Sequence, residues 1–478
     1  MTHEPGHAGP QGVTRREFVV RAAAGLAAGR LAVDERTALG REWTVARPVP
    51  SPAQLAWQRD ELALFLHFGV NTFTDREWGD GTENPGIFAP TALDARQWAR
   101  AAKAGGFRML ILTAKHHDGF CLWPTATTVH SVASSPFRGG KGDVVREMVD
   151  ACRAERLKVG LYCSPWDRNS PVYGDSPRYN DLFCDQLTEL LTRYGTVDEV
   201  WFDGANGEGP NGRKQTYDWP RFWELVRRLQ PNAVMFSDAG PDIRWIGNER
   251  GVAGDTNWST MNPDAVPYPG ADGPGIIAAL QNGDPDGSVW RPGETDVSIR
   301  PGWFYHPAED AKVKAVDQLV DLYFTSVGRN SKLLLNVPPT RAGLLHETDV
   351  ARIAGMADRL ATLTGPDLAR ARSLRASTSD DRSAVFELDL GHDSTISVTD
   401  IREAIEHGQV VSRYVVEGAA NAASGDWRTI ASGTTIGYRK LDRFPPTRVR
   451  RLRLTVETVA RLPRPLELRV AGRGWETG

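Results

Sequence analysis

One acidic residue stands directly at the end of an apolar run. The segment Val200-Trp201-Phe202-Asp203-Gly204-Ala205 passes from buried-type residues straight into a carboxylate. Gly204 permits a tight turn and a close approach of a substrate, because it has no Cβ. A turn residue or a helix N-cap is the structural alternative for such an aspartate. The pattern predicts a strand-end carboxylate, Asp203, that is placed to act as a nucleophile.

A second carboxylate follows in Arg244-Trp245-Ile246-Gly247-Asn248-Glu249, in a predicted loop beyond the fifth strand. A nucleophilic carboxylate needs a partner acid that protonates the departing oxygen, and two such groups are the machinery of glycosidic bond hydrolysis. Aromatic neighbours desolvate a carboxyl group and help it to hold its proton. A solvated loop glutamate beside Arg250 is the alternative. The residues alone leave both interpretations of Glu249 open, a partner acid of Asp203 or a solvated loop residue.

Polar and aromatic residues also end the other apolar runs. In a parallel (β/α) barrel the strand ends and the loops after them build the active site, so this accumulation is informative. The strand-end residues are His67 and Asn71, His116, His117 and Asp118, Tyr162 with Trp166 and Asp167, Trp201, and Ser237 with Asp238.

Metal ligation is not indicated. His116 and His117 are adjacent, and neighbouring residues on a strand point to opposite faces unless the strand bends or ends there. The sequence has neither HxH nor HExxH spacing, and its four cysteines never stand as CxxC. We therefore expect no metal and no cofactor, histidines that donate to sugar hydroxyls, and buried free thiols.

These residues need a scaffold of alternating strands and helices, and the chain has that pattern. Nearly continuous apolar runs predict strands buried on both faces, as in a parallel sheet. Amphipathic stretches between them predict helices, and no GxGxxG follows the first strand. The predicted fold is a (β/α)8, TIM-like barrel. Its strands are expected at 62–70, 108–117, 158–166, 197–205, 233–240 and 332–339, and its helices at 94–106, 143–157, 180–195 and 222–231.

The pattern changes after about residue 366. Runs at 383–390, 394–401, 410–418, 448–457 and 466–472 alternate with period two and are rich in β-branched residues. Turn residues separate them at the spacing of an antiparallel β-sandwich. We expect a catalytic barrel over 45–365 and a C-terminal β-sandwich over 366–478.

The sequence pattern in the N-terminal segment 1–44 predicts that the protein is exported. Thr14-Arg15-Arg16-Glu17-Phe18 resembles a twin-arginine signal, followed by a short apolar stretch interrupted by Arg21. The expected location is periplasmic or extracellular, and the cytoplasm is the alternative. A net charge of -3 gives no general attraction to nucleic acid, and no run reaches the length of a membrane span. The sequence leaves the oligomeric state open.

Five blocks together resemble glycoside hydrolase family 29, the α-L-fucosidases. They are LHFGVNTFTDREWGDG (66–81), TAKHHDGFCLWPT (113–125), LYCSPWD (161–167), EVWFDGANGEGPNG (199–212) and RWIGNERG (244–251). The resemblance covers roughly residues 45 to 365. It implies a retaining double displacement, with Asp203 as nucleophile and Glu249 as acid/base.

The resemblance also implies a fucose pocket and a substrate class. The GEGPNG (207–212) and WIGNE (245–249) segments are similar to the branch that prefers α-1,3- and α-1,4-linked fucose on Lewis-type glycans, so the expected partner is a fucosylated oligosaccharide or glycoconjugate. A broad-specificity fucosidase, a non-catalytic fucose-binding barrel and a metal-dependent hydrolase are the alternatives. The positions that match fucose-holding residues are His67, Glu77, Trp78, His116, His117, Tyr162 and Trp201, with Trp303 in RPGWFYHP (300–307) as a further candidate.

Overall fold

The computed structural model describes residues 47–370, 374–380, 382–420, 425–462 and 466–472. The predicted export segment 1–44 lies outside these ranges. Within them, none of the helices combines the length and the apolar character that a membrane crossing needs.

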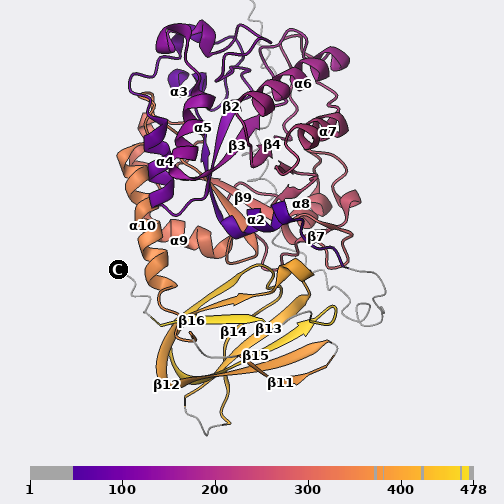
Figure 1. The fold of residues 1–478 in the computed structure, drawn as a ribbon, viewed down its shortest axis with the longest axis vertical. Helices are drawn as coiled ribbons and strands as arrows, with labels where there is room; N and C mark the ends of the chain where they lie inside the picture. The colour runs from indigo at the N-terminus through magenta and orange to yellow at the C-terminus, as the bar shows by residue number, and fades with distance from the viewer. Residues whose placement is uncertain (1–46, 371–373, 381, 421–424, 463–465, 473–478) are drawn as a thin grey trace, which may run out of the picture. The chain divides into compact units, whose positions relative to one another are not determined.

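Eight parallel strands close into a barrel, which confirms the predicted fold (Figure 1). Around the barrel the order is β1-β10-β9-β6-β5-β4-β3-β2. The strands are β1 (Leu62–Leu66), β2 (Met109–Lys115), β3 (Lys158–Cys163), β4 (Glu199–Trp201), β5 (Val234–Ser237), β6 (Ile243–Trp245), β9 (Gly293–Ser298) and β10 (Ser331–Asn336). Six of them coincide with the predicted apolar runs, whereas β6 and β9 were not predicted.

Strand β9 escaped prediction because its buried residues are mostly polar. All six residues of Gly-Glu-Thr-Asp-Val-Ser are buried. Glu294 and Asp296 alternate on the strand and accept hydrogen bonds from the indoles of Trp201 and Trp245, at 3.0 and 2.7 Å. Those indoles belong to the apolar cluster inside the barrel. Carboxylates that pair with buried indoles inside the barrel therefore produce a strand without an apolar run.

Helices surround the barrel strands (Figure 1), and the longer ones, such as α4, α5 and α6, bury apolar side chains in the main core. Aspartates begin several of them: Asp94 and Asp143 accept backbone N–H groups of α4 and α5, which satisfies donors that have no partner in the helix. The helices are α2 (Pro52–Asp60), α3 (Val70–Thr74), α4 (Ala95–Ala104), α5 (Val144–Glu155), α6 (Ser176–Arg193), α7 (Trp219–Leu229), α8 (Pro274–Asn282), α9 (Val316–Thr325) and α10 (Glu347–Leu363). A small hairpin pairs β7 (Thr260–Met261) with β8 (Val289–Trp290).

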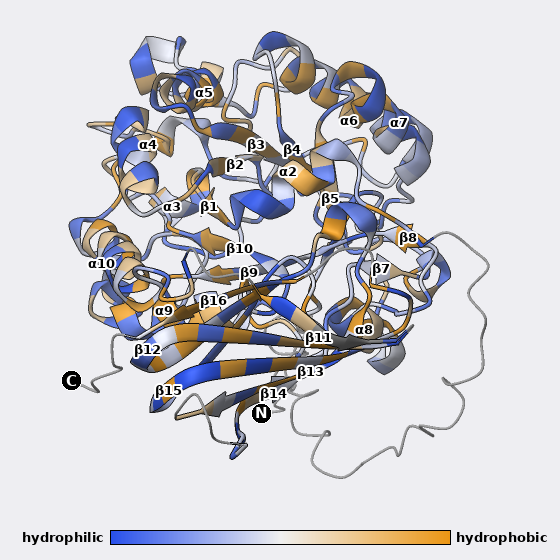
Figure 2. Ribbon diagram, turned by 60° about the horizontal axis from the view of Figure 1, so that its bottom comes forward, coloured by the Kyte–Doolittle hydropathy of each residue, from blue (hydrophilic) through white to orange (hydrophobic). Residues whose placement is uncertain are grey.

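Helix α2 covers the N-terminal ends of the strands. Gln54 donates to the carbonyls of Asp242 and Trp290, both at 2.7 Å. Trp57 inserts its ring into the barrel interior, and Figure 2 shows α2 within the ring of barrel strands. This end is closed by packing, so the opposite, C-terminal ends of the strands are left for chemistry.

The C-terminal region forms an antiparallel sheet in the order β11-β12-β15-β13-β14, with β16 paired to β12. The strands are β11 (Arg375–Ser379), β12 (Ser383–Arg402), β13 (Val411–Ala419), β14 (Arg428–Gly433), β15 (Lys440–Thr458) and β16 (Glu467–Ala471). The runs predicted at 383–390 and 394–401 are one strand, β12, whose pairing with β15 shifts register at two places. Its first half lies beside β11 and its second half beside β16. Both halves contribute to one apolar cluster, as expected of a sandwich.

Candidate active site

Asp203 lies just beyond β4 and is 8% exposed. Its Oδ1 accepts a hydrogen bond from the backbone N–H of Ala205 at 2.7 Å, which fixes the orientation of the carboxylate. Its Oδ2 accepts a hydrogen bond from the Tyr162 hydroxyl at 3.1 Å and lies 3.8 Å from His117 Nε2. The structure thus brings side chains from the ends of β2, β3 and β4 to one carboxylate.

The packing of the protein itself requires a glycine at position 204. A Cβ at this position would lie 2.5 Å from Asp238 Oδ2 and 2.6 Å from the backbone nitrogen of Gly270. Gly270 N–H also donates to Asp238 Oδ2 at 2.8 Å. The neighbour that the structure shows at Gly204 is the loop around Gly270, and the close approach of a substrate stays a prediction.

His67 is held by Asn336, at the end of β10. Its Nδ1 lies 2.8 Å from Asn336 Oδ1, while Asn336 Nδ2 donates to the Trp303 carbonyl at 2.8 Å. Because the amide oxygen faces the ring, Nδ1 carries the proton and Nε2 is left as an acceptor. Burial lowers the pKa of His67 to about 4, so the ring is neutral at neutral pH.

The two adjacent histidines lie side by side, with ring centroids 4.1 Å apart, because β2 ends at Lys115 just before them. The geometry of opposite strand faces therefore does not apply. His117 Nδ1 contacts Ser164 Oγ at 2.7 Å. His116 Nδ1 is buried and has no hydrogen-bond partner within the described part of the chain. Burial, with His117 and His67 nearby, lowers the pKa of His116 well below its ordinary value.

The carboxylate of Glu77 binds a neighbouring loop. It accepts backbone N–H groups of Trp303 and Phe304 at 2.8 and 3.3 Å, and it lies 2.6 Å from His306 Nε2. These contacts hold the loop that contains Trp303, and a contact of Glu77 with a sugar hydroxyl stays a prediction. The Trp303 ring centroid lies 5.1 Å from that of His67, which places this indole beside the site.

Trp78 forms an aromatic edge beside His117 and Trp166. Its ring makes T-shaped contacts with His117 and Trp166, at 5.6 and 5.5 Å between centroids. It is 37% exposed, which leaves part of the indole available to a ligand.

Glu249 follows β6, the sixth barrel strand, and is half-buried. The sequence placed it beyond the fifth strand, because the three residues of β6 were taken as part of a loop. Since β4, β5 and β6 are parallel neighbours, their C-terminal ends lie at the same edge of the barrel. Asp203 and Glu249 therefore follow strand ends on the same side.

Several supporting residues were missed by the sequence reading. Asn336 ends the apolar run of β10, so the strand-end rule applied to that run would have found it. Ser164 accepts the His117 contact and donates to the Trp166 carbonyl at 2.8 Å. Glu294 and Asp296 gave no signal, because they lie on the strand that was not predicted.

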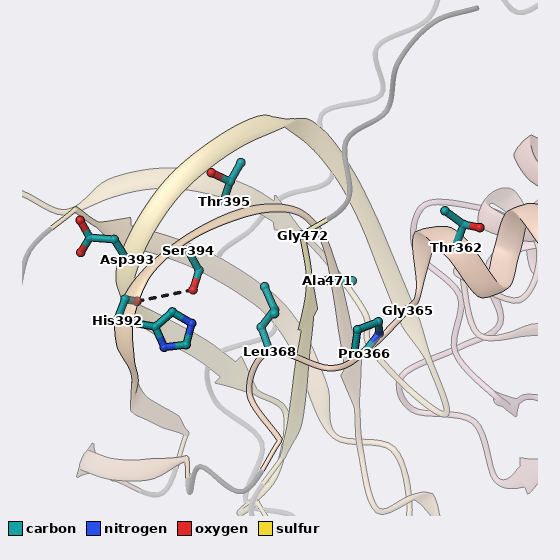
Figure 3. A pocket seen from close by; sticks show the side chains of 10 residues that line it. All are labelled: Thr362, Gly365, Pro366, Leu368, His392, Asp393, Ser394, Thr395, Ala471 and Gly472. Atoms are coloured by element: carbon teal, nitrogen blue, oxygen red, sulfur yellow. Dashed lines mark hydrogen bonds between the residues drawn. The ribbon is translucent and has the colours of Figure 1, made fainter.

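Other groups in the described residues offer less chemistry. All four cysteines are buried and free, as predicted. No set of three or more His, Cys, Asp or Glu side chains in those ranges has the arrangement of a metal site. A cavity in the C-terminal domain has Leu368, Pro366 and Ser394 in its wall (Figure 3). Its ionisable residues, His392 and Asp393, are exposed, so it lacks the desolvated groups found at the barrel strand ends.

The barrel with a buried carboxylate, imidazoles and indoles at its C-terminal strand ends has the features of a carbohydrate-active hydrolase. The sequence profile of the alpha-L-fucosidase family matches residues 67–363. The chain belongs to this family, glycoside hydrolase family 29, and is a glycoside hydrolase of the α-L-fucosidase type.

Curated and solved relatives support this assignment over most of the chain. Alpha-L-fucosidase 1 of Arabidopsis thaliana is 44% identical over 423 residues, covering 83% of this chain and 82% of the plant protein. The crystal structure of SpGH29 has a TM-score of 0.83 and 41% identity, covering 89% of this chain and 98% of its own. A Ruminococcus gnavus GH29 fucosidase in complex with fucose has a TM-score of 0.80 and 31% identity, covering 91% and 98%.

Proposed function

We propose that the protein is a retaining exo-α-L-fucosidase that removes terminal α-1,3- or α-1,4-linked fucose from branched, Lewis-type glycans. Asp203 is the nucleophile and Glu249 is the acid/base. The observation that carries the proposal is the environment of Asp203. This carboxylate is nearly buried, fixed at Oδ1 by a backbone N–H, and directed at Oδ2 toward Tyr162 and His117.

The reaction proceeds in two displacements. A carboxylate oxygen of Asp203 attacks the anomeric carbon of fucose, and the bond from that carbon to the glycosidic oxygen breaks. The leaving oxygen takes the proton of the Glu249 carboxyl group. Glu249, now a carboxylate, removes a proton from water, whose oxygen attacks the same carbon and releases Asp203. Two inversions give net retention.

The neutral imidazoles supply hydrogen-bonding sites for the sugar. His116 Nδ1 is buried without a protein partner in the described ranges, a state that a ligand hydroxyl relieves. His67 presents Nε2 as an acceptor, because its Nδ1 donates to Asn336. Trp78 and Trp303 offer apolar faces beside these nitrogens, which suits the C6 methyl side of fucose. The fucose complex of the R. gnavus relative favours the same sugar here.

The loop after Asp203 is an argument for a substrate with a branched aglycone. Gly207 lies against Trp166, where a Cβ would come within 2.1 Å of the indole, and Trp166 Nε1 donates to the Glu208 carbonyl at 3.0 Å. This loop is thereby held next to the nucleophile. On the other side, Tyr268 is 59% exposed, two residues before the Gly270 that packs on Gly204. An aromatic rim of this kind offers stacking surfaces beyond the fucose ring.

The test of mechanism is chemical rescue. Asp203→Ala should abolish hydrolysis, and azide should restore turnover with formation of a fucosyl azide. Undiminished hydrolysis by this variant would remove Asp203 from its proposed role.

The test of specificity is a competition between substrates. Lewis-type trisaccharides should be cleaved in preference to an aryl fucoside and to a linear α-1,2-fucosylated glycan. Faster cleavage of the α-1,2 linkage would assign the protein to the broad-specificity branch. Fucose binding measured by calorimetry with no product after a day would favour a non-catalytic barrel.

A further inference from the structure

Three ionisable side chains are buried together inside the barrel, below the active site. They are Glu199 of β4, Glu294 of β9 and Lys332 of β10, with exposures of 0%, 0% and 1%. Burying a charge is costly unless it is paired and hydrogen-bonded, so their contacts must account for each of them. None of the three takes part in the chemistry proposed above.

In each of the two glutamates, one carboxyl oxygen has a partner and the other has none among the described residues. Glu199 Oε2 accepts a hydrogen bond from Trp57 Nε1 at 2.7 Å and lies 3.5 Å from Lys332 Nζ. Glu294 Oε1 accepts a hydrogen bond from Trp201 Nε1 at 3.0 Å. The other two oxygens, Glu199 Oε1 and Glu294 Oε2, are buried and receive no donor from the described residues. The two glutamates are within hydrogen-bonding reach of one another.

The charges do not balance if both glutamates are ionised. Two carboxylates would then share the cation Lys332, and Glu199 Oε1 and Glu294 Oε2 would stay buried acceptors without a donor from the described residues. One added proton corrects both defects, because it makes the cluster neutral and supplies the missing donor.

We propose that Glu199 and Glu294 share one proton, with Glu294 as a neutral carboxylic acid whose Oε2–H donates to Glu199 Oε1. Glu199 and Glu294 are then positioning residues, which hold Trp201 and, through it, the nucleophile. The part concerning catalysis rests on the proposed function, whereas the shared proton does not.

The surroundings assign the proton to Glu294. Burial raises the pKa of Glu294 well above its ordinary value, and the negative charges of Glu199 and Asp296 raise it further, against the opposing effect of Lys332. Burial also raises the pKa of Glu199, but Lys332 and the Trp57 indole oppose that rise. The carboxylate nearer the cation therefore stays ionised. Asp296, also on β9, accepts its hydrogen bond from Trp245.

The cluster is linked to the active site through aromatic packing. The Trp201 ring stacks on Phe236 at 3.9 Å between centroids and lies 5.3 Å from the Tyr162 ring. Tyr162 donates to Asp203, which follows Trp201 by two residues. A Glu294 that lost its proton would strain the contact below Trp201 and shift these groups.

The proton can be detected by infrared difference spectroscopy at about pH 9. At this pH Asp118 and Glu403, each with a pKa of about 7, are largely ionised and do not contribute. The wild type should show the carboxylic acid C=O band, and Glu294→Gln should lose it.

A matched control is Glu189→Gln. Glu189 also accepts an indole hydrogen bond, from Trp123 at 2.7 Å, but hydrogen bonds and Arg193 lower its pKa. This variant should keep the band. A band that persists in Glu294→Gln, or its absence from the wild type, would overturn the shared proton.

Kinetics of the same variants test positioning. Glu294→Gln keeps a donor to Glu199 and an acceptor for Trp201, so kcat should stay within about threefold of the wild type. Glu294→Leu removes both and should lower kcat about 10- to 100-fold with little change in KM, because displaced catalytic groups cost rates of that order. Equal loss in the two folded variants would contradict the positioning role. If the wild type cleaves no fucoside, the proposed function fails, and the infrared result still decides the shared proton.

Discussion

The two cores of this molecule are built by opposite rules. The C-terminal sheet encloses leucine, valine and phenylalanine side chains from strands that alternate between apolar and polar residues, as Figure 2 shows along β12 and β15. The barrel interior holds glutamates, a lysine, histidines and indoles among its apolar residues. The first core only has to exclude water. The barrel core buries polar side chains at a cost in folding free energy. These side chains lie beneath and around Asp203, the carboxylate that we propose as the nucleophile.

Buried polar side chains differ in the same way between the two regions. Glu403, in the C-terminal region, accepts backbone N–H groups of Val410, Val411 and Gly437, so its carboxylate is satisfied by the fold. At the barrel strand ends, His116 keeps a buried nitrogen without a protein partner in the described ranges. A buried polar group whose partner is missing is thus a better sign of a binding site than burial alone.

The largest expected effect separates chemistry from folding. Asp203→Asn should lower kcat/KM by about 10⁴-fold or more, because it removes the proposed nucleophile. The midpoint of thermal unfolding should change little, since Ala205 can still donate to the amide oxygen. Steady-state kinetics and calorimetry on the same preparation measure both quantities. A large loss of stability together with activity near that of the wild type would contradict this prediction, because Asp203 would then serve folding and not chemistry.

The C-terminal core should give the reverse result. Phe386 is 3% exposed within the apolar cluster. Phe386→Ala should lower the free energy of unfolding by about 3–5 kcal/mol, from lost burial and the cavity left behind. The kcat of the protein that remains folded should equal that of the wild type. A tenfold fall in kcat would mean that this region shapes the active site.

The next effect is a pH dependence carried by His67. Its pKa is about 4 when folded and 6.5 when exposed, so the unfolded chain binds the extra proton between these values. The contribution of His67 to the free energy of unfolding is fully present above about pH 6.5 and is lost as the pH falls toward 4. Relative to His67→Gln, the wild type should lose about 3 kcal/mol of unfolding free energy over that range. Parallel stability curves for the two proteins would refute the buried neutral state.

The smallest effect compares two tyrosines in matched settings. Tyr162 donates to Asp203 at 3.1 Å, and Tyr414 in the C-terminal sheet donates to Asp442 at 2.8 Å. Tyr162→Phe should lower kcat/KM about tenfold, the scale of one hydrogen bond to a charged group. Tyr414→Phe should lower the unfolding midpoint and leave kcat/KM unchanged. Equal kinetic effects from both would remove the distinction between the two regions.

The sequence predicted the features that depend on hydrophobic pattern and on position along the chain, namely most of the barrel strands and the residues at their ends. The apolar runs located six barrel strands, because strands buried on both faces must be apolar where they meet the helices. Asp203 was found because it directly follows such a run. Strand β9 was not predicted, since Glu294 and Asp296 interrupt its apolar pattern. Their indole partners, Trp201 and Trp245, come together with them only in the closed barrel. For the same reason, the use of Glu77 by the Trp303 backbone could not be predicted from residue type.

The central claim is that Asp203 forms a covalent bond to the sugar, and trapping tests it most directly. A 2-deoxy-2-fluoro-fucosyl fluoride reacts through a good leaving group, and its fluorine slows hydrolysis of the intermediate. Incubation followed by proteolysis and mass spectrometry should show one fluorofucosyl group on the peptide that contains Asp203. A label on a different residue, or an unlabelled enzyme that releases fucose with inverted anomeric configuration, would contradict the account.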